Sequence, residues 1–400
     1  MKRTASTLEA ALEALEAQRL RRTRITVAAT AAHGERRLEL ADGRHLVDFS
    51  SNDYLGLAHH PALATAMSAC AAACGAGSGA SHLVTGHGIE HARLEEELAA
   101  FTHRERALLF STGYMANLAV LTALAGHGER VLLDRLCHAS LIDGARLSGA
   151  TLSRYPHGDA GAAARLAVAD PGHTVMVVTD GVFSMDGDLA PLPELCRIAH
   201  AADAWLLVDD AHGLGVIGAS GAGALEHFGL TSEEVPILVG TLGKAFGSCG
   251  AFVAGAAQLI ELLIQRARSY IYTTALPQPV AAASRAALVV ARTEGWRRER
   301  LGALTTRFRA RAAQAGVTLG LSQTPIQPVM LGSPGAALDA QRELAEAGFL
   351  VVAIRPPTVP AGSARLRVTL SAAHTEGQID ELVAALAPIS ERARRAGPIE

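Results

Sequence analysis

Short apolar runs alternate with longer amphipathic segments between about residues 105 and 285. The runs are rich in Val, Ile and Leu: RALLF, RVLLD, TVMVVTD, AWLLVDD, PILVGT and GAFVAG. Between them lie segments of ten or more residues, as at 114–127, 138–147, 191–203 and 256–270. This spacing is typical of β-α-β crossovers on a mostly parallel sheet. Because such a sheet is covered on both faces, its strands read as nearly continuous apolar runs, as these do.

The pattern also indicates how the chain divides. PILVGT and GAFVAG are too close for a crossover helix, which predicts that they pair antiparallel as a hairpin. After about residue 285 a long helix ends near Gly316, and PVMLG, a helix at 334–347, FLVVAI and RLRVTL follow, as in a smaller α+β domain. Thr375 and Gln378 predict a capping box at the start of the last helix. We expect an N-terminal helix and arm (1–48), a large domain (49–285) and a small C-terminal domain (286–400).

Composition favours an enzyme of small molecules. With 400 residues, of which 49% are hydrophobic and 19% charged, the chain can fill a sizeable core. Its net charge of −3 gives no excess of positive charge to attract nucleic acid or an anionic membrane. The first twenty residues read as an amphipathic helix rather than a leader, and there is no membrane-spanning run, so we expect a cytoplasmic protein. The five cysteines contain no C-x-x-C pair and predict buried thiols, without disulfides or a zinc ribbon.

Lysine is almost absent from this chain. Lys2 and Lys244 are the only lysines among 36 basic residues, which leaves 36 − 2 = 34 arginines. Lys244 lies in the small, glycine-rich, apolar stretch VGTLGKAFGSCGAF. A lysine in a desolvating pocket can lose its proton and attack a carbonyl, whereas an arginine cannot. Lys244 is therefore a candidate nucleophile or Schiff-base residue, with a phosphate-binding or helix-capping lysine as an equal alternative on this stretch alone.

Polar side chains follow three of the predicted strands. Asp209 ends AWLLVDD and is followed by His212, Ser184 follows TVMVVTD, and Thr241 ends PILVGT three residues before Lys244. The carboxyl edge of an open α/β sheet is where ligands bind. An amine, a carboxylate, hydroxyls and backbone amides together are what pyridoxal phosphate needs, and His138 after RVLLD is placed to stack on its ring.

Other motifs fit less well. GLGVIG at 213–218 matches a dinucleotide-binding fingerprint but is separated from its strand and not followed by a helix pattern. Gly243-Lys244 lacks the first glycine and the Ser/Thr of a phosphate-binding loop, and no serine lies in G-x-S-x-G. His87 and His91 are four residues apart with no third ligand evident, so we expect no metal site.

The chain as a whole resembles the α-oxoamine synthases, pyridoxal-phosphate enzymes of the aspartate aminotransferase fold. The resemblance rests on FSSNDYLGL (49–57), GSGASHLVTG (77–86), STGYMANLAV (111–120), DRLCHASLIDG (134–144), GVFSMDGDLAPL (181–192), VDDAHGLGVIG (208–218), GTLGKAFGSCGA (240–251) and RLRVTLSAAHT (365–375). It implies the type I fold of pyridoxal-phosphate-dependent transferases, with a mostly parallel seven-stranded sheet flanked by helices and a smaller C-terminal α+β domain. It also implies a homodimer with sites at the interface.

The same resemblance implies roles for individual residues. Lys244 would carry the Schiff base, Asp209 would pair with the pyridine nitrogen, and His212 would bond the ring hydroxyl. His138 would stack on the ring and face the substrate, and Lys244, His138 and Asp209 would be catalytic. The further cofactor contacts would come from Gly113, Tyr114, Ser184, Thr241 and, across the dimer, Thr273 or Thr274. The substrates would meet Arg21, Asn52, Thr358 and Arg367.

Within the family, AIRPPTVPAG at 353–362 looks most like the branch that condenses L-alanine with a pimeloyl thioester in biotin biosynthesis. The rivals are glycine C-acetyltransferase, 5-aminolevulinate synthase and serine palmitoyltransferase. A catalytically inactive structural subunit is a further alternative, against which Lys244 argues. The sequence leaves open whether the pimeloyl group arrives on coenzyme A or on an acyl carrier protein, and which of Arg21, Arg22 and Arg24 meets it.

Overall fold

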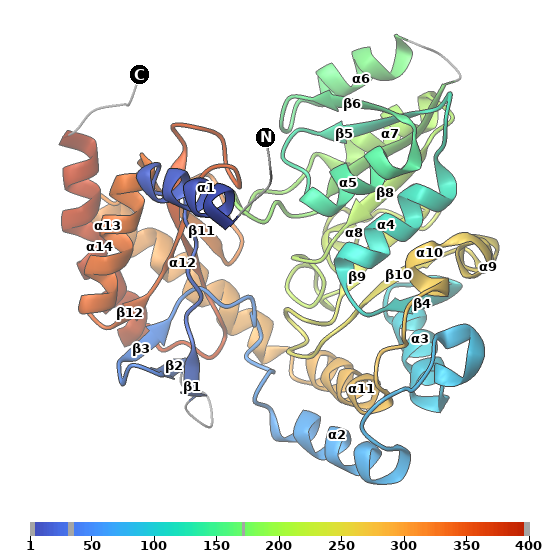
Figure 1. Cartoon of the computed structure of the whole chain (residues 1–400), viewed down its shortest axis with the longest axis horizontal. Coiled ribbons are helices and arrows are strands. Elements are labelled where there is room, and N and C mark those ends of the chain that lie inside the picture. Colours follow the sequence, from blue (N-terminus) through green and yellow to red (C-terminus); the bar gives the residue numbers. More distant parts are fainter. Residues whose placement is uncertain (1–4, 31–35, 170–172, 396–400) are drawn as a thin grey trace. The chain divides into compact units, whose positions relative to one another are not determined.

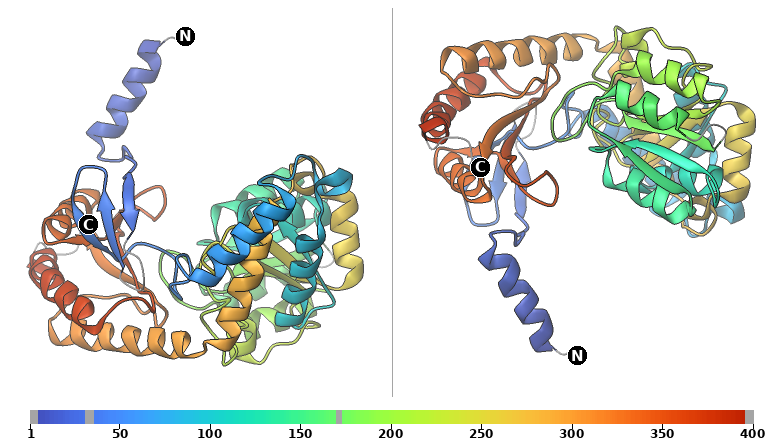
Figure 2. Two further views of the ribbon diagram at one scale, coloured as in Figure 1. Left: turned by 90° about the horizontal axis from the view of Figure 1, so that it is seen from below. Right: turned by 90° about the horizontal axis from the view of Figure 1, so that it is seen from above.

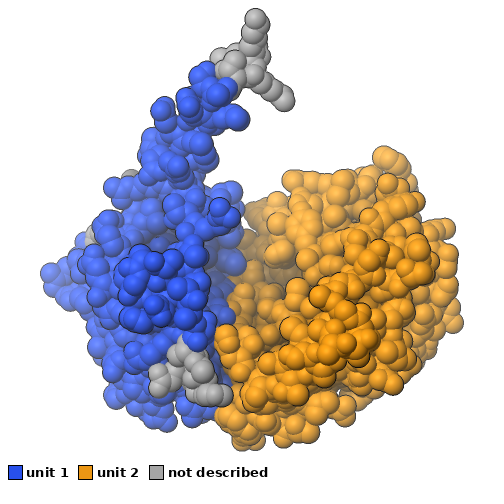
Figure 3. All heavy atoms as spheres, turned by 60° about the horizontal axis from the view of Figure 1, so that its bottom comes forward, with its two compact units in different colours: residues 1–51, 185–187, 300–400 blue, residues 52–184, 188–299 orange. Residues whose placement is uncertain are grey.

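The structure, a computed structural model, describes residues 5–30, 36–169 and 173–395 (Figure 1). The chain forms two compact units, coloured separately in Figure 3. The larger comprises residues 52–184 and 188–299, and the smaller comprises 1–51, 185–187 and 300–400. The domain limits expected from the sequence, at 48/49 and 285/286, stay predictions.

A seven-stranded sheet forms the centre of the larger unit. It is mostly parallel, as the strand spacing predicted, and has the seven strands that the family resemblance implied. In spatial order its strands are β4 (Arg106–Phe110), β10 (Ala251–Gly255), β9 (Ile237–Thr241), β8 (Trp205–Asp209), β7 (Thr174–Asp180), β5 (Arg130–Asp134) and β6 (Thr151–Tyr155). Only β10 runs against its neighbours, pairing antiparallel with both β9 and β4. The predicted hairpin of PILVGT and GAFVAG is therefore confirmed.

Helices cover both faces of this sheet, and alternate residues of the central strand β8 point to opposite faces. Leu207 packs in one apolar cluster, while Leu206 and Val208 pack in the other. The first cluster includes residues of α4 (Gly113–Leu124), α5 (Ala139–Ser148), α9 (Ala257–Arg266) and α10 (Arg268–Ile271). The second includes residues of α6 (Ala160–Val168), α7 (Leu192–Ala201) and α8 (Ala224–Phe228). Each fully buried Leu or Val contributes about 1.5–3 kcal/mol of transfer free energy to this core.

Further helices complete the larger unit. They are α2 (Pro61–Cys74), the π-helix η1 (His82–Gly86), α3 (Ile89–Phe101) and α11 (Gln278–Thr293), and α11 packs on both α2 and α3. The helix α12 (Trp296–Gln314) begins in the larger unit and continues into the smaller one.

The smaller unit contains two sheets. One has the order β1 (Val27–Thr30), β2 (Arg37–Leu40), β3 (His45–Asp48) and β12 (Phe349–Leu350); the other has the order β11 (Ile326–Gly332), β14 (Ala364–Thr369) and β13 (Val352–Ile354). The run FLVVAI, expected as one strand, is thus divided between two sheets. Helices α13 (Pro334–Glu346) and α14 (Glu376–Arg395) belong to this unit. At the start of α14, Thr375 and Gln378 exchange the two hydrogen bonds of the predicted capping box, at 2.9 and 3.2 Å.

The N-terminal helix α1 (Ala5–Ala17) forms where the sequence predicted it, but it buries none of its residues. Figure 2 shows α1 extending away from the sheets of its own unit. Within the described ranges, no helix combines the length and apolar character that a bilayer crossing requires.

The prediction of buried cysteines is wrong for three of the five. Cys137 and Cys196 are buried, but Cys74 and Cys249 are exposed and Cys70 is only partly covered. Cys70 and Cys74 lie near the end of α2, a helix of small residues of which only Leu63 is fully buried. A Cys-rich, Ala-rich helix thus need not place its thiols in the core.

Candidate active site

Lys244 lies in the tight connection between β9 and β10. The connection is closed by backbone hydrogen bonds, from Leu242 N–H to the Gly250 carbonyl and from Ser248 N–H to the Leu242 carbonyl, both 2.9 Å. It packs closely against the segment that precedes α2: a Cβ on Gly247 would lie 2.3 Å from the backbone nitrogen of Ala58, and Gly247 has φ +60°. The close approach of the Ala58 backbone and the positive φ therefore require a glycine at position 247.

The amine of Lys244 is at one end of a polar chain. Its Nζ lies 2.8 Å from Nε2 of His212, whose Nδ1 lies 2.6 Å from the Tyr54 hydroxyl, which in turn donates to Oδ1 of Asn52 at 3.3 Å. If the ring proton of His212 is on Nδ1, all three contacts can be hydrogen bonds at once: Lys244 donates to Nε2, Nδ1–H donates to the Tyr54 hydroxyl, and that hydroxyl donates to Asn52. In that tautomer His212 accepts from the amine and fixes its position.

Asp209 ends β8 with its carboxylate held by two donors. Its Oδ1 accepts from the Ala211 N–H at 3.0 Å, and its Oδ2 accepts from the Asn117 side-chain amide at 2.6 Å. Asp180 ends β7 directly beside it in register. Burial, followed by repulsion from Asp209, raises the pKa of Asp180 well above its ordinary value. Asp180 therefore keeps its proton more readily than an ordinary aspartate does.

His138 caps the N-terminus of α5, and its backbone N–H donates to Oδ2 of Asp180 at 3.0 Å. Its ring Nδ1 lies 2.7 Å from the hydroxyl of Ser140. Burial and the positive charge of Lys244 lower the pKa of His138, and Asp209 opposes them only in part. A neutral imidazole is therefore presented beside the carboxylate.

These side chains surround one cavity of about 190 Å³ in the larger unit. Eight of the residues singled out in the sequence line it: Gly113, Tyr114, His138, Ser184, Asp209, His212, Thr241 and Lys244. Asn117, Asp180 and Ala211 also line it but were not predicted. Asn117 lies one helical turn after Gly113 in α4, so the helix period offered a signal for it. Asn52 is connected to the cavity lining through Tyr54 and His212.

The remaining predicted residues lie elsewhere. Thr273 and Thr274 follow α10 in the larger unit, half-buried and exposed respectively, and are not among the residues that line the cavity. Arg21, Thr358 and Arg367 belong to the smaller unit, where Arg367 is buried on β14. Arg22 donates to the Thr358 hydroxyl at 3.3 Å.

The smaller unit has a second cavity, of about 500 Å³, with a basic lining: Glu16, Arg19, Arg21, Leu338, Asp339, Arg342 and Arg355. Four arginines against two acids make this cavity attractive to an anionic group.

The pair of histidines noted in the sequence has a third member. One ring nitrogen from each of His82, His87 and His91 lies within 4.8 Å of the others, so His82 is a third potential ligand that the sequence did not reveal. His82 and His87 contact each other through Nδ1 at 2.9 Å, and His91 uses Nδ1 for the Gly88 N–H and Nε2 for the Leu276 carbonyl. Burial, then the other two histidines, lowers the pKa of His82 to about 3, so the cluster is a neutral hydrogen-bonded network.

Comparison with known proteins gives consistent results. The model of the family described as aminotransferase class I and II matches residues 44–386. The 8-amino-7-oxononanoate synthase of Thioalkalivibrio sulfidiphilus is 62% identical over 87% of this chain and 89% of its own length, and other relatives of that name range from 57% to 62%. Among solved structures, the S. paucimobilis serine palmitoyltransferase with a bound PLP–myriocin adduct is 29% identical with a TM-score of 0.91, covering 98% of this chain and all of its own. The 8-amino-7-oxononanoate synthase from Francisella tularensis is 33% identical with a TM-score of 0.77, covering 88% and 98%.

Proposed function

This chain belongs to the aminotransferase class I and II family, and on that premise we propose that it is an 8-amino-7-oxononanoate synthase. The proposed reaction joins L-alanine to a pimeloyl thioester with loss of CO₂ and of the free thiol, using pyridoxal phosphate, in biotin biosynthesis. The observation that carries the proposal is the cavity in which Lys244, Asp209, His212 and His138 meet. The sequence identity of 62% to synthases of that name supports the choice of substrates.

The cavity suits pyridoxal phosphate by its donor set. The first two N–H groups of α4, from Gly113 and Tyr114, have no acceptor inside the helix and favour a phosphate, as do the hydroxyls of Ser184 and Thr241. A Cβ added to Gly113 would meet no atom within 4 Å, so there is open space where a phosphate would approach. When bound, this cofactor supplies an electron sink conjugated to the α-carbon of the amino acid.

The protein's own groups would then divide the remaining tasks. Lys244 would hold the cofactor and, with its amine free, would take the α-proton of the amino acid as general base. Asp209 would face the pyridine nitrogen and favour the protonated form of that nitrogen; each pKa unit by which it does so is worth about 1.4 kcal/mol. His212 would bond the ring hydroxyl and position the Lys244 amine, and the neutral His138 would stack on the ring. Asn117 orients the Asp209 carboxylate.

For the substrates, we infer that Asn52 and Arg367 hold the amino-acid carboxylate and that Arg21 and Thr358 meet the acyl group. We also infer a homodimer in which Thr273 or Thr274 reaches the cofactor phosphate of the neighbouring subunit, consistent with the position of both threonines outside the cavity lining. The cytoplasmic location and the identity of the acyl carrier stay predictions.

A second candidate is a serine palmitoyltransferase-like activity, because structures of that enzyme match this chain with TM-scores up to 0.91. Thiol release by the cofactor-loaded protein separates the two. L-Alanine, glycine and L-serine are crossed with pimeloyl-, acetyl-, succinyl- and palmitoyl-CoA, and pimeloyl-acyl carrier protein is added as a further donor. We expect release only from L-alanine with a pimeloyl thioester and none with Lys244→Ala; release that depends on serine and palmitoyl-CoA would overturn the first assignment.

A further inference from the structure

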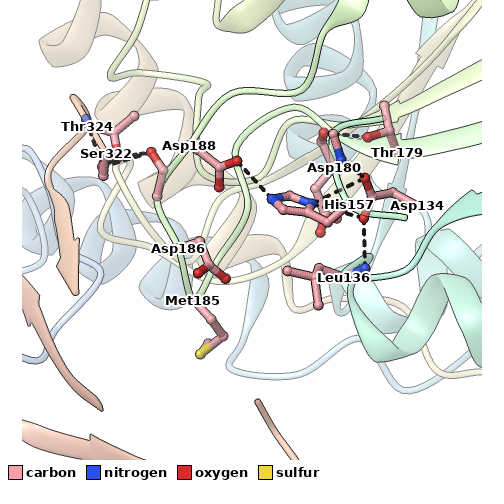
Figure 4. A network of polar contacts seen from close by, with 12 residues as sticks. Asp134, Leu136, His157, Thr179, Asp180, Met185, Asp186, Asp188, Ser322 and Thr324 are labelled. Atoms are coloured by element: carbon pink, nitrogen blue, oxygen red, sulfur yellow. Dashed lines mark hydrogen bonds and ion pairs between the residues drawn. The ribbon is translucent and has the colours of Figure 1, made fainter. Parts of the chain in front are cut away.

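Figure 4 shows His157 between the carboxylates of Asp134 and Asp188. None of these three residues is among those that line the cofactor cavity. Its Nδ1 lies 3.1 and 3.2 Å from the two oxygens of Asp134, and its Nε2 lies 2.8 Å from Oδ2 of Asp188. Asp134 ends β5, His157 follows β6, and Asp188 lies in the connection after β7. The imidazole therefore joins three segments that leave the same edge of the sheet.

The segments that contain Asp134 and Asp188, which His157 joins, both lead to residues that line the cavity. Oδ1 of Asp134 accepts from the Leu136 N–H at 2.7 Å, in the turn that leads to His138. The carbonyl of Asp188 accepts from the Phe183 N–H at 3.0 Å, next to Ser184, and the His157 ring stands edge-on to Phe183 at 4.4 Å. His138 and Ser184 both line the cavity.

The contacts on both ring nitrogens define the charge of His157. A neutral imidazole donates from one nitrogen only, whereas a protonated one donates from both. Burial alone would lower the pKa of His157, but the hydrogen bonds to Asp134 and Asp188 outweigh it and raise the pKa to about 10. At neutral pH the ring is thus a cation between two acids.

We propose that His157 is a positioning residue that holds the connections carrying His138 and Ser184 in their places at the cofactor cavity. The role rests on the proposed function, since it acts on cofactor binding through these two residues. His157 does not line the cavity itself, so its effect passes through Asp134 and Asp188.

Two substitutions separate the two halves of this bridge. In His157→Asn the side-chain amide can replace Nδ1 at Asp134, and in His157→Gln it can replace Nε2 at Asp188; neither spans both acids or carries the charge. His227→Gln is the matched control, because His227 also stands edge-on to a phenylalanine, Phe228, at 4.8 Å but is exposed on α8.

The apo proteins are first compared by hydrogen exchange at the amides of Phe183 and Ala190, which donate to the carbonyls of Asp188 and Gly181. The same proteins are then titrated with pyridoxal phosphate and followed by the visible absorbance of the lysine-bound cofactor. In both His157 variants we expect faster exchange at these amides and a dissociation constant for pyridoxal phosphate that is raised about tenfold. Tenfold is the smaller end of the loss in affinity seen when a metal ligand loses the hydrogen-bond partner that orients it. His227→Gln should match the wild type.

Each other outcome has a defined meaning. Unchanged exchange in both variants would show that His157 does not hold the connections together. Faster exchange with unchanged affinity for the cofactor would show that His157 has no positioning role at the cavity. If the wild type itself gives no visible absorbance with pyridoxal phosphate, the proposed function fails and the positioning role fails with it, while the exchange arm still shows whether His157 joins the segments.

Discussion

Asp209 and its chain neighbour Asp210 are held in different ways at the end of β8. Asp209 accepts hydrogen bonds on both oxygens, from Ala211 and Asn117. Its chain neighbour Asp210 is fully buried, and burial raises its pKa to about 8 despite the N–H groups of Ala224 and Gly213. Near pH 7 we therefore expect the side chain of Asp210 to be mostly neutral.

This difference gives the first prediction. Asp209→Asn should leave the cofactor bound but lower kcat about a hundredfold or more, because the ionised partner of the pyridine nitrogen is lost. Asp210→Asn is the matched control: it removes little charge near neutral pH and keeps an acceptor for the Ala224 N–H, 2.7 Å from Oδ2. Steady-state kinetics with absorbance spectra of both loaded variants make the comparison. Full activity in Asp209→Asn would refute the role given to this carboxylate.

The charge of His157 gives a prediction about pH. Its pKa is about 10 in the folded protein against an ordinary 6.5, so its contribution to stability is complete below about pH 6.5 and is lost as the pH rises through about 10. The difference in the free energy of unfolding between the apo wild type and His157→Gln should therefore shrink over this range. Urea unfolding at several pH values measures it. A difference that stays constant with pH would show that His157 is not charged in the folded state.

At the scale of elements, the connection between β9 and β10 depends on one glycine. In Gly247→Ala the new Cβ would meet the backbone of Ala58 at a residue with φ +60°, so backbone must move. We expect a loss of about 1–3 kcal/mol in stability and weaker cofactor binding, since Lys244 lies in the same turn.

The control for this substitution is Gly302→Ala in the interior of α12. Gly302 has no atom within 4 Å of its Cβ position, and alanine favours a helix by about 1 kcal/mol. Thermal unfolding and cofactor titration of both variants should show opposite signs in stability. Equal effects from the two substitutions would contradict the close packing at Gly247.

The elements that the sequence predicted best are strands that are buried on both faces of the sheet. Strands β5, β7, β8, β9 and β10 are buried over nearly their whole length and read as continuous apolar runs. The edge strand TLSRY of β6 escaped notice, because Ser153 and Arg154 interrupt its apolar pattern and only Tyr155 is buried. FLVVAI was read as one strand because a local pattern cannot show that the chain leaves one sheet after Leu350 and enters another at Val352, with Val351 between the two strands.

At the scale of the whole molecule, the site could be predicted where residues lie just after strands or at a helix start. Asp209, Ser184, Lys244 and Gly113 are such residues, and the sheet brings them to one edge. Asn117 escaped because it lies inside α4, and it reaches the cavity only through the packing of that helix against the sheet. The sequence did not predict that His82 lies close to His87 and His91. The π-helix η1 sets the spacing of these histidines, and no regular sequence period indicates such a helix.

The arginines of the smaller unit give a prediction about substrate recognition. Arg21 lines the basic cavity, whereas Arg22 is hydrogen-bonded to Thr358. If Arg21 meets the acyl group, Arg21→Ala should raise the KM for the pimeloyl thioester about tenfold, the order of one lost hydrogen bond to a charged group, and leave the KM for L-alanine unchanged. Arg24→Ala serves as the control. A larger effect from Arg24 than from Arg21 would assign acyl recognition to the other arginine.

The most direct test of the proposed reaction follows the carbon atoms of the amino acid. L-Alanine labelled with ¹³C in its carboxyl group is incubated with a pimeloyl thioester, on coenzyme A and on acyl carrier protein, and the loaded wild type or Lys244→Ala. We expect the label to leave as CO₂ and an unlabelled 8-amino-7-oxononanoate to form, with the wild type alone. Label retained in the product, or no condensation product from L-alanine with either thioester, would contradict the proposed reaction.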